Sequence, residues 1–306
     1  MRLRKLFLWG LVLLGFITFL SLGYIYYRQN KFLISFHSHL EKEINSFPGK
    51  VGLIFKILKF KRAHPLFGKK IDFYFNPHLR FKAASVIKLP LLVVCLKSLK
   101  DKNLDLSKKF VLKKRFITGG SGILKNRKPG EKYSLYQLLR TMIVYSDNTS
   151  SNMIIAILGK DFINEKFKEL GLTNTFLERN IMDLYARRRG KENYVSAQDC
   201  QKILEDVYRK KFGKVNSSMM ISFLLAQQVR DRLPRYLPSD VYVAHKTGLE
   251  RGVVHDVGII FSPQADYILV ILTESKLSYR KAKKFIARLS KIIYDYIENF
   301  PYDYRD

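Results

Sequence analysis

Ser85-Val-Ile-Lys88 is the first of three short motifs that decide the fold of this chain, and Ser146-Asp-Asn148 and Lys246-Thr-Gly248 follow it in that order. A Ser-x-x-Lys pattern alone is weak, because a second copy stands without partners at Ser278 and Lys281. The other two motifs each occur once. Their separations, 61 residues (85 to 146) and 100 residues (146 to 246), are typical of one catalytic domain. Together they indicate a serine that a lysine activates for attack on an amide.

The surrounding sequence resembles a known family over roughly residues 45 to 300. The trio of motifs is the signature of class A β-lactamases and penicillin-binding proteins. The similarity to class A extends to segments of its helical lobe and to the strand after the third motif, at residues 120–124, 133–139, 142–148, 157–159, 170–173, Thr175 and 255–260. The resemblance implies a penicillin-recognising serine hydrolase that needs no cofactor.

The pattern of apolar residues predicts an α/β (α+β) fold. Alternating or continuous apolar runs predict strands at 51–60, 70–75, 241–245, 257–261 and 267–273, with a turn at 65–68. Helices are expected at 83–99, 136–144, 150–158, 162–170 and 278–300. Pro90 either kinks the first of these helices or marks where it begins.

Strands at both ends of the chain and helices between them imply two lobes. One is an antiparallel sheet flanked by helices, from about 45–80 and 195–300, and the other is all-helical, from about 85–195. We expect them to form one domain over 31–306, because a chain of 306 residues with 47% hydrophobic residues can bury a large core. The three motifs then meet at the seam between the lobes.

The first 30 residues predict a membrane anchor. Residues 6–27 carry no charge, and Arg2, Arg4 and Lys5 precede them. As a helix this stretch reaches about 33 Å, enough to cross the apolar core of a bilayer. A cleavable signal peptide is the alternative, but its apolar region is shorter and the best small-x-small site, Ser21-Leu-Gly23, is followed by Tyr24. We expect one span in the cell membrane, with the catalytic domain outside the cytoplasm.

The net charge of +29 indicates attraction to polyanions. Nucleic acid is not expected, because no nucleic-acid-binding motif is present and an anchored outer domain would not meet it. Anionic lipid headgroups or an acidic wall polymer fit better, and a merely solvated lysine-rich surface is the alternative. The densest clusters are Lys108-Lys109 with Lys113-Lys-Arg115, and Arg187-Arg-Arg189 with Lys191.

Cysteine and histidine patterns argue against a metal site. Cys95 and Cys200 allow at most one disulfide, and Cys95 lies in an apolar run that favours a buried, inert thiol. Neither belongs to a motif with metal-ligand spacing, and the six histidines form no His-x-x-x-His pair. We therefore expect neither metal nor cofactor.

The first motif suggests its own chemistry. Residues three apart on a helix share a face, so Lys88 is expected beside the hydroxyl of Ser85. A lysine that is partly desolvated and close to a second cation has a lowered pKa and can act as a base. A serine at a helix start also has backbone N–H groups directed at a developing oxyanion.

The resemblance implies the remaining roles. The N–H of Leu249 would complete the oxyanion hole, and Ser146 would pass a proton to the leaving nitrogen. Asn148 would hold Lys88 and the amide of the substrate. Lys246 and Thr247 would receive its carboxylate, while Gly248 would let it lie against the strand edge. Each motif has a structural alternative as a helix cap or strand end, and an inactive relative would keep the same pattern.

One departure from class A concerns hydrolysis of the acyl-enzyme. That family carries a Glu-x-x-Leu-Asn motif on the loop after its helical lobe, and its Glu activates water. The alignment of residues 175–179 with the approach to that loop places Ile181 where Glu is expected. Glu178 and Asp183 are the nearest acids. Three functions remain open: a β-lactamase, a peptidase acting on D-Ala-D-Ala-like wall peptide, and a penicillin binder with little turnover.

Overall fold

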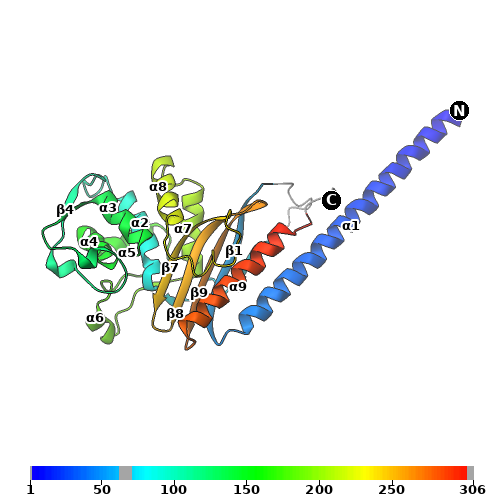
Figure 1. Ribbon diagram of the computed structural model, residues 1–306. Helices are drawn as coiled ribbons and strands as arrows, with labels where there is room; N and C mark the ends of the chain where they lie inside the picture. Colours follow the sequence, from blue (N-terminus) through cyan, green and yellow to red (C-terminus); the bar gives the residue numbers. More distant parts are fainter. Residues whose placement is uncertain (1, 62–70, 302–306) are drawn as a thin grey trace.

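A five-stranded antiparallel sheet forms the centre of the molecule in a computed structural model that describes residues 2–61 and 71–301 (Figure 1). Its strand order is β2-β1-β9-β8-β7. The strands are β1 (Gly49–Phe60), β2 (Phe73–Phe75), β7 (Tyr242–Glu250), β8 (Val253–Phe261) and β9 (Ala265–Ser275). The first and last parts of the described chain therefore build one sheet, and β7 ends it with an edge that no strand covers.

Helices cover both faces of this sheet and form a separate cluster beside it (Figure 1). α1 (Arg2–Asn45) and α9 (Tyr279–Glu298) lie side by side on one face. The other helices are α2 (Lys88–Lys97), α3 (Leu135–Val144), α4 (Asn148–Leu158), α5 (Lys160–Glu169), α6 (Leu184–Arg188), α7 (Ala197–Tyr208) and α8 (Lys214–Leu225). Two small sheets pair β3 (Phe81–Lys82) with β6 (Tyr194–Val195), and β4 (Lys109–Val111) with β5 (Lys132–Ser134).

Two hydrophobic cores hold the layers together. One packs α1 and α9 against the sheet through residues such as Phe36, Phe55 and Ile293. The other joins the opposite face of the sheet to the helical cluster, with Ile54, Leu92 and Ile154 fully buried. The alternation of β1 explains the division, because Ile54 and Phe55 point to opposite faces of the sheet. Because both faces of the sheet are buried in these cores, the position of the helical cluster at the β7 edge is fixed.

α1 is a single continuous helix whose two halves have different surroundings. Large apolar side chains of its first half are exposed, including Trp9 at 72%. From Gln29 onward the helix is held by the domain, since Gln29 donates to the carbonyl of Pro301 and Phe32 packs edge-on against Tyr296 and Phe300. The helix is long and apolar enough to cross a membrane. The predicted anchor thus continues into the predicted domain without a linker.

The sequence-based fold class is confirmed, and most predicted elements are present. The strands predicted at 51–60, 257–261 and 267–273 and the helices at 136–144, 150–158, 162–170 and 278–300 match β1, β8, β9, α3, α4, α5 and α9 within a few residues. β7 is longer than predicted and contains the whole third motif. Residue 70 and the predicted turn at 65–68 lie outside the described residues.

The helix predicted at 83–99 differs in its first turn. Residues Ala84–Ile87 form a 3₁₀ turn, and the α-helix begins at Lys88. Pro90 therefore lies in the first turn of α2, where a missing N–H costs no helical hydrogen bond. Of the two interpretations of Pro90, the one that marks a helix start is correct.

Candidate active site

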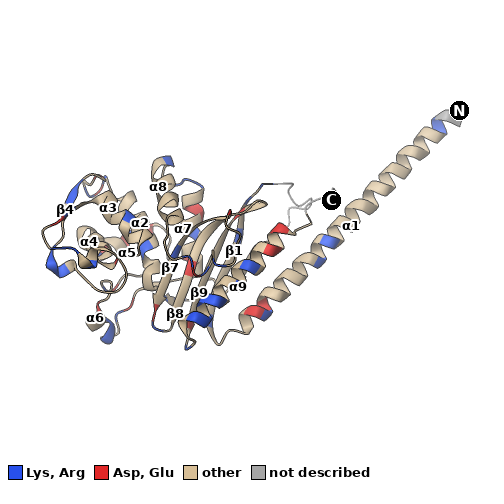
Figure 2. Ribbon diagram, viewed as in Figure 1, with Lys and Arg blue, Asp and Glu red and all other residues tan. Residues whose placement is uncertain are grey.

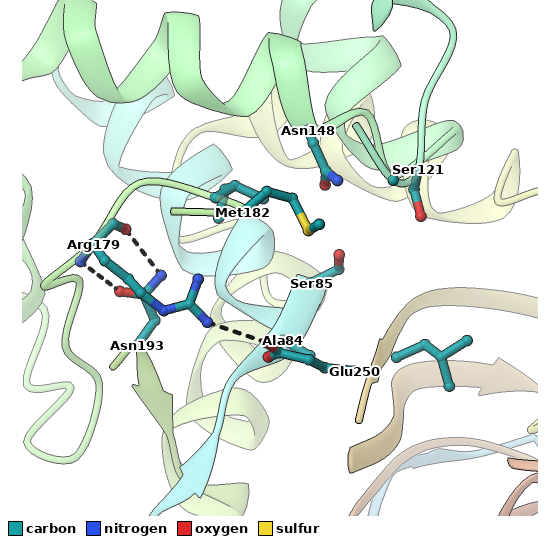
Figure 3. Close-up of a pocket in the computed structure, with 11 residues that line it drawn as sticks. Ala84, Ser85, Ser121, Asn148, Arg179, Met182, Asn193 and Glu250 are labelled. Atoms are coloured by element: carbon teal, nitrogen blue, oxygen red, sulfur yellow. Dashed lines mark hydrogen bonds and ion pairs between the residues drawn. The ribbon is translucent and has the colours of Figure 1, made fainter. Parts of the chain in front are cut away.

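Ser85 lies on the 3₁₀ turn that leads into α2, between the helical cluster and β7. It borders a pocket of about 120 Å³ that Asn148 and Met182 also line, and Figure 3 shows its hydroxyl directed toward these two side chains. The preceding Ala84 has φ +44°, a left-handed conformation that non-glycine residues rarely adopt. The turn therefore holds the Ser85 side chain at the pocket in a locally strained backbone.

Lys88 is fully buried beneath Ser85, as the motif predicts. Its Nζ donates to the Ser85 hydroxyl at 3.2 Å, to the Ser146 carbonyl at 2.6 Å and to Asn148 Oδ1 at 2.7 Å. Burial, and then the charge of Lys246, hold the pKa of Lys88 well below its usual value, although Asp147 opposes the shift. A neutral Lys88 amine is therefore accessible and in contact with the oxygen it would deprotonate.

Ser146 joins the two lysines. Its hydroxyl accepts from Lys88 Nζ at 3.2 Å and from Lys246 Nζ at 3.0 Å, so one oxygen bridges both amines. Its φ of +53° is left-handed, which costs a non-glycine residue about 1–2 kcal/mol. The bond from Lys88 to the Ser146 carbonyl helps to hold that conformation. Such a bridge gives a proton a continuous path between the two sides of the pocket.

Asp147, the middle residue of the second motif, has a structural role. Its side chain accepts from the N–H of Ser150 and so caps α4. The other carboxylate oxygen accepts from the N–H groups of Ile123 and Leu124 at 2.6 and 2.7 Å. Because the carboxylate is buried, these bonds replace water and pin the 120–124 loop to α4. A Cβ on Gly122 would overlap Asp147, which explains the glycine there.

Lys246 is fully buried in β7, opposite Lys88. Its Nζ donates to Ser146 and to the Thr247 carbonyl at 2.9 Å. Burial lowers its pKa to about 7; Asp256 opposes that shift, and the Arg232 guanidinium adds to it. Near neutral pH the side chain is therefore poised between charged and neutral forms, and a bound anion would favour the charged one.

A buried polar cluster accompanies Lys246. His245 Nδ1 lies 2.8 Å from Asp256, whose other oxygen accepts from the N–H of Leu233 at 3.0 Å. Arg232 is 1% exposed, and its Nε has no hydrogen-bond partner among residues 2–61 and 71–301. This cluster places a second cation near Lys246, as the effect on the Lys246 pKa records.

Gly248 and Leu249 complete the third motif. A Cβ on Gly248 would come within 3.1 Å of Val86 and of His255, so the glycine lets the Ser85 turn pack against β7. This packing reason is additional to the predicted contact with substrate, which stays a prediction. Leu249 lines the pocket, and its predicted part in an oxyanion hole also stays a prediction.

The wall of the pocket opposite β7 is the loop that contains Arg179, Ile181 and Met182. Arg179 forms an ion pair with the buried Glu192 at 2.6 Å and a longer one with the partly exposed Glu250 at 3.4 Å. Arg187 also pairs with Glu250, the last residue of β7. Figure 3 shows the Arg179–Glu250 contact below Ser85. These pairs close the loop onto the sheet.

The acids near Ser85 are all engaged. The two that the sequence suggested as water-activating bases have other partners, because Asp183 caps α6 and Glu178 accepts from the N–H of Glu192 at 2.9 Å. Neither lines the pocket. Glu250 does line it, but two arginines hold its carboxylate.

Ile181 occupies the position that the sequence alignment compared with the class A glutamate. Its backbone is clamped by Asn152, which accepts from its N–H at 2.8 Å and donates to its carbonyl at 3.1 Å. The side chain lines the pocket and carries no base. Met182 follows with φ +63°. The loop is thus held in place by Asn152, with an apolar side chain in the lining of the pocket that Ser85 borders.

The described residues contain no group of three or more His, Cys, Asp or Glu side chains that could hold a metal ion. Both cysteines are free and buried, which confirms the predicted burial of Cys95, and burial raises the pKa of its thiol to about 12. At the other Ser-x-x-Lys, Ser278 caps α9, as the structural alternative predicts.

Of the eight predicted site residues, Ser85, Asn148 and Leu249 line the pocket, and Lys88 bonds to two of these three. Ser146 and Lys246 join Lys88 behind the lining through the Ser146 hydroxyl, the Thr247 carbonyl accepts from Lys246, and Gly248 packs against Val86. The sequence patterns did not indicate the roles of Arg179, Glu192 and Glu250, which close the loop, or of Asn152, which holds its backbone. Their spacing along the chain follows no helix or strand period, so only an alignment with a known structure could have found them.

Comparisons with known proteins identify the family of this chain. The family model described as the β-lactamase enzyme family matches residues 35–297. Among curated proteins, the extended-spectrum β-lactamase PER-1 of Pseudomonas aeruginosa is 22% identical over 236 residues, covering 72% of this chain and 77% of that protein. β-Lactamase VEB-1 of the same organism is 24% identical over 241 residues, with 73% and 80% covered.

Solved structures share the fold. PBP-A superposes with a TM-score of 0.77 at 24% identity, covering 86% of this chain and 96% of that one. A β-lactamase from Sphaerobacter thermophilus has a TM-score of 0.74 at 24% identity, with 85% and 95% covered. A mutant of PBP-A, also with a TM-score of 0.77, was solved as an acyl-enzyme complex with penicillin G at 24% identity, covering 87% and 97%.

Proposed function

This chain belongs to the β-lactamase enzyme family and is a serine hydrolase of that type, and from this premise we propose that it forms an acyl-enzyme on Ser85 with β-lactams and related amides and releases it slowly. The observation that carries the proposal is the buried Lys88, whose Nζ contacts the Ser85 hydroxyl while its pKa is lowered. A nucleophile within hydrogen-bond distance of a buried base is the arrangement that covalent catalysis requires.

In the proposed acylation, neutral Lys88 takes the proton of Ser85 as Oγ bonds to the carbonyl carbon of the amide. The carbon–nitrogen bond then breaks, and the leaving nitrogen receives a proton from Ser146, which Lys88 replenishes through its 3.2 Å contact. Lys246 and Thr247 hold the carboxylate of the substrate, and backbone N–H groups of Ser85 and Leu249 stabilise the oxyanion.

Hydrolysis of the ester needs a base within reach of a water molecule, and such a base contributes about 10²–10⁴-fold. The pocket supplies Ile181 where a carboxylate would serve, and its acid, Glu250, is held by Arg179 and Arg187. These contacts favour a second function, in which the protein is a peptidase for D-Ala-D-Ala-like wall peptide, and β-lactams act on it as slow substrates or inhibitors. The mutant of PBP-A, which shares this fold, is an acyl-enzyme complex with penicillin G, and this supports the proposed acylation.

The test is an intact-mass time course with penicillin G, paired with turnover assays on a chromogenic lactam and a D-Ala-D-Ala peptide. We expect one adduct per chain that persists for minutes or longer. Release of D-alanine identifies the peptidase. Rapid lactam turnover without a detectable adduct would contradict slow release, and an adduct that survives Ser85→Ala would contradict the nucleophile.

We also propose that residues 6–27 anchor the protein in the cell membrane, with the catalytic domain outside the cytoplasm. The support is the exposed apolar half of α1, which passes into the domain without a linker. Fractionation should place the full-length chain with membranes, and protease added to whole cells should reach the domain. A mature protein that begins near residue 24 and is free in the medium would overturn the anchor.

A further inference from the structure

The β4–β5 hairpin and its long connecting loop carry the highest local excess of positive charge near the active site. Residues 108–132 contain nine lysines and arginines and one acid, Glu131, whereas the whole chain has 55 basic and 26 acidic residues. All nine basic side chains are exposed. We call these nine residues the basic rim. Their ratio of nine to one, against about two to one overall, separates this segment from a uniformly lysine-rich surface.

The positive charge of the basic rim is not neutralised within the molecule. None of the nine side chains forms an ion pair with a carboxylate of the described residues. Glu131 accepts instead from the Tyr133 hydroxyl and from the N–H of Lys128. Some cations elsewhere are paired, as Lys56 is with Glu205 and Arg187 with Glu250. Nine unpaired charges close together repel one another, so an external anion would stabilise them.

The basic rim is continuous with the catalytic pocket. Its loop contributes Gly120 and Ser121 to the pocket wall, and Lys125 Nζ donates to the Gly120 carbonyl at 2.7 Å. The N–H of Asn148 donates to the Ser121 carbonyl at 3.1 Å, which ties the loop to the second motif. On the other side of the pocket, beyond Met182, Arg188 at the end of α6 and Arg189 just after it are exposed. An anionic chain that passed through the pocket would meet positive charge at both ends.

The position of the basic rim argues against the bilayer that would hold α1 as its binding partner. β4 and α6 lie at the end of the molecule farthest from the N-terminus of α1, and Figure 2 shows lysine and arginine at that end (Figures 1 and 2). A surface on that side faces away from any membrane that the apolar half of α1 enters. Lipid headgroups are therefore not the partner, although the net charge alone allowed them.

The form of the basic rim suits a long, flexible anion. Lysine predominates, and its ammonium binds as a mobile point charge, unlike the fixed bidentate fork of arginine. The charges are spread along an exposed loop and not gathered in a buried cradle. We propose that the basic rim binds the carboxylates of a peptide-bearing wall strand, so that the amide presented to Ser85 is attached to a polymer. This inference rests on the proposed function.

The test is co-sedimentation of the full-length protein, in a non-ionic detergent, with purified wall sacculi. The variant Lys113→Glu/Lys114→Glu/Lys128→Glu reverses three charges of the basic rim. We expect retention to fall by about tenfold to a hundredfold, since each exposed ion pair is worth up to roughly fivefold. Retention of the wild type should also weaken as salt is raised.

The matched control is Lys276→Glu/Arg280→Glu/Lys281→Glu, which makes the same charge change at exposed sites near the start of α9. Its retention should equal that of the wild type. Equal losses in both variants would show a general charge effect and overturn the basic rim. Penicillin labelling of the wild type is measured in parallel. If the wild type is not labelled, the proposed function is wrong. Its retention on sacculi then still tests whether the basic rim binds the wall.

Chemical treatment of the sacculi identifies the anion. Removal of phosphodiester-linked polymers with hydrofluoric acid should leave retention unchanged, whereas amidation of the peptide carboxylates should abolish it. The reverse result would overturn the proposal in favour of a phosphate-bearing polymer. Two other results would overturn the proposal. If the protein binds phosphatidylglycerol vesicles and the Lys113→Glu/Lys114→Glu/Lys128→Glu variant does not, the partner is lipid. If a DNA oligonucleotide displaces the protein from sacculi at a lower concentration of charges than polyglutamate does, the partner is nucleic acid.

Discussion

The two walls of the pocket are built differently. On the side of α2, α4 and β7, polar side chains are buried, in contact and directed at one another, as the bridge from Lys88 through Ser146 to Lys246 shows. On the side of the 178–193 loop, every acid has a structural partner, and the side chain that lines the pocket at the compared position is the apolar Ile181. The first wall is arranged to move protons, and the second to hold a shape. In the proposed function, this difference separates acylation from slow release of the acyl group.

Removing the base from the first wall should have the largest effect. We expect Lys88→Ala to slow labelling of Ser85 by a fluorescent penicillin by about 10²–10⁴-fold, the usual contribution of a positioned base. Lys281→Ala, in the motif whose serine caps α9, is the control and should label at the wild-type rate. Comparable losses in both variants would contradict the assignment of the base, and stopped-flow fluorescence measures them.

Adding a base to the second wall should speed hydrolysis of the acyl-enzyme. We expect Ile181→Glu to shorten the lifetime of the penicillin adduct by up to about 10²–10⁴-fold, because Asn152 already holds that backbone beside the pocket. Ile181→Gln adds a side chain of the same shape without a base and should leave the lifetime long. An intact-mass time course decides, and equal lifetimes in the two variants would rule out this position for the catalytic water.

Breaking the ion pairs of the second wall should cost stability. Arg179→Ala removes the closer of the two arginines that pair with the buried carboxylate of Glu192, while Arg187 remains at 3.2 Å. Loss of a hydrogen bond to a charged group typically costs about 1.5–3 kcal/mol of unfolding free energy. The exposed Lys291–Asp295 pair on α9 offers a control, since Lys291→Ala should change that free energy by only about 0.3–0.5 kcal/mol. Urea unfolding measures both, and a small effect of Arg179→Ala would show that packing alone closes the loop.

The pH dependence of acylation should show the smallest effect. Because the pKa of Lys246 is lowered to about 7, its ammonium is lost as pH rises through that value, and with it the partner of the substrate carboxylate. We expect acylation by penicillin to fall by at most about tenfold per unit above pH 7. The methyl ester of the same penicillin lacks that carboxylate and should show no such fall, so matching alkaline limbs for both compounds would contradict the role of Lys246.

The sequence by itself determined the chemistry of the first wall. Ser85 and Lys88 are one helical turn apart, and the third motif lies within a strand, so local periodicity was enough to predict how each motif presents its residues. The same periodicity predicted β1, β8, β9 and the closing helix, because each buries one face against a core. It also showed that the span 6–27 carries no charge.

Only the tertiary structure decided the second wall and the direction of the basic rim. Arg179 contacts Glu250, which is 71 residues away in the sequence, and Asn152 contacts Ile181, which is 29 residues away. Contacts between residues so far apart in the sequence follow from the packing of the lobes and not from any local period. The same packing places Gly120 and Ser121 of the 108–132 segment in the pocket lining, and the β4 end of that segment lies away from the N-terminus of α1. Net charge is a property of the sequence, but its orientation relative to a membrane and an active site depends on how the chain folds.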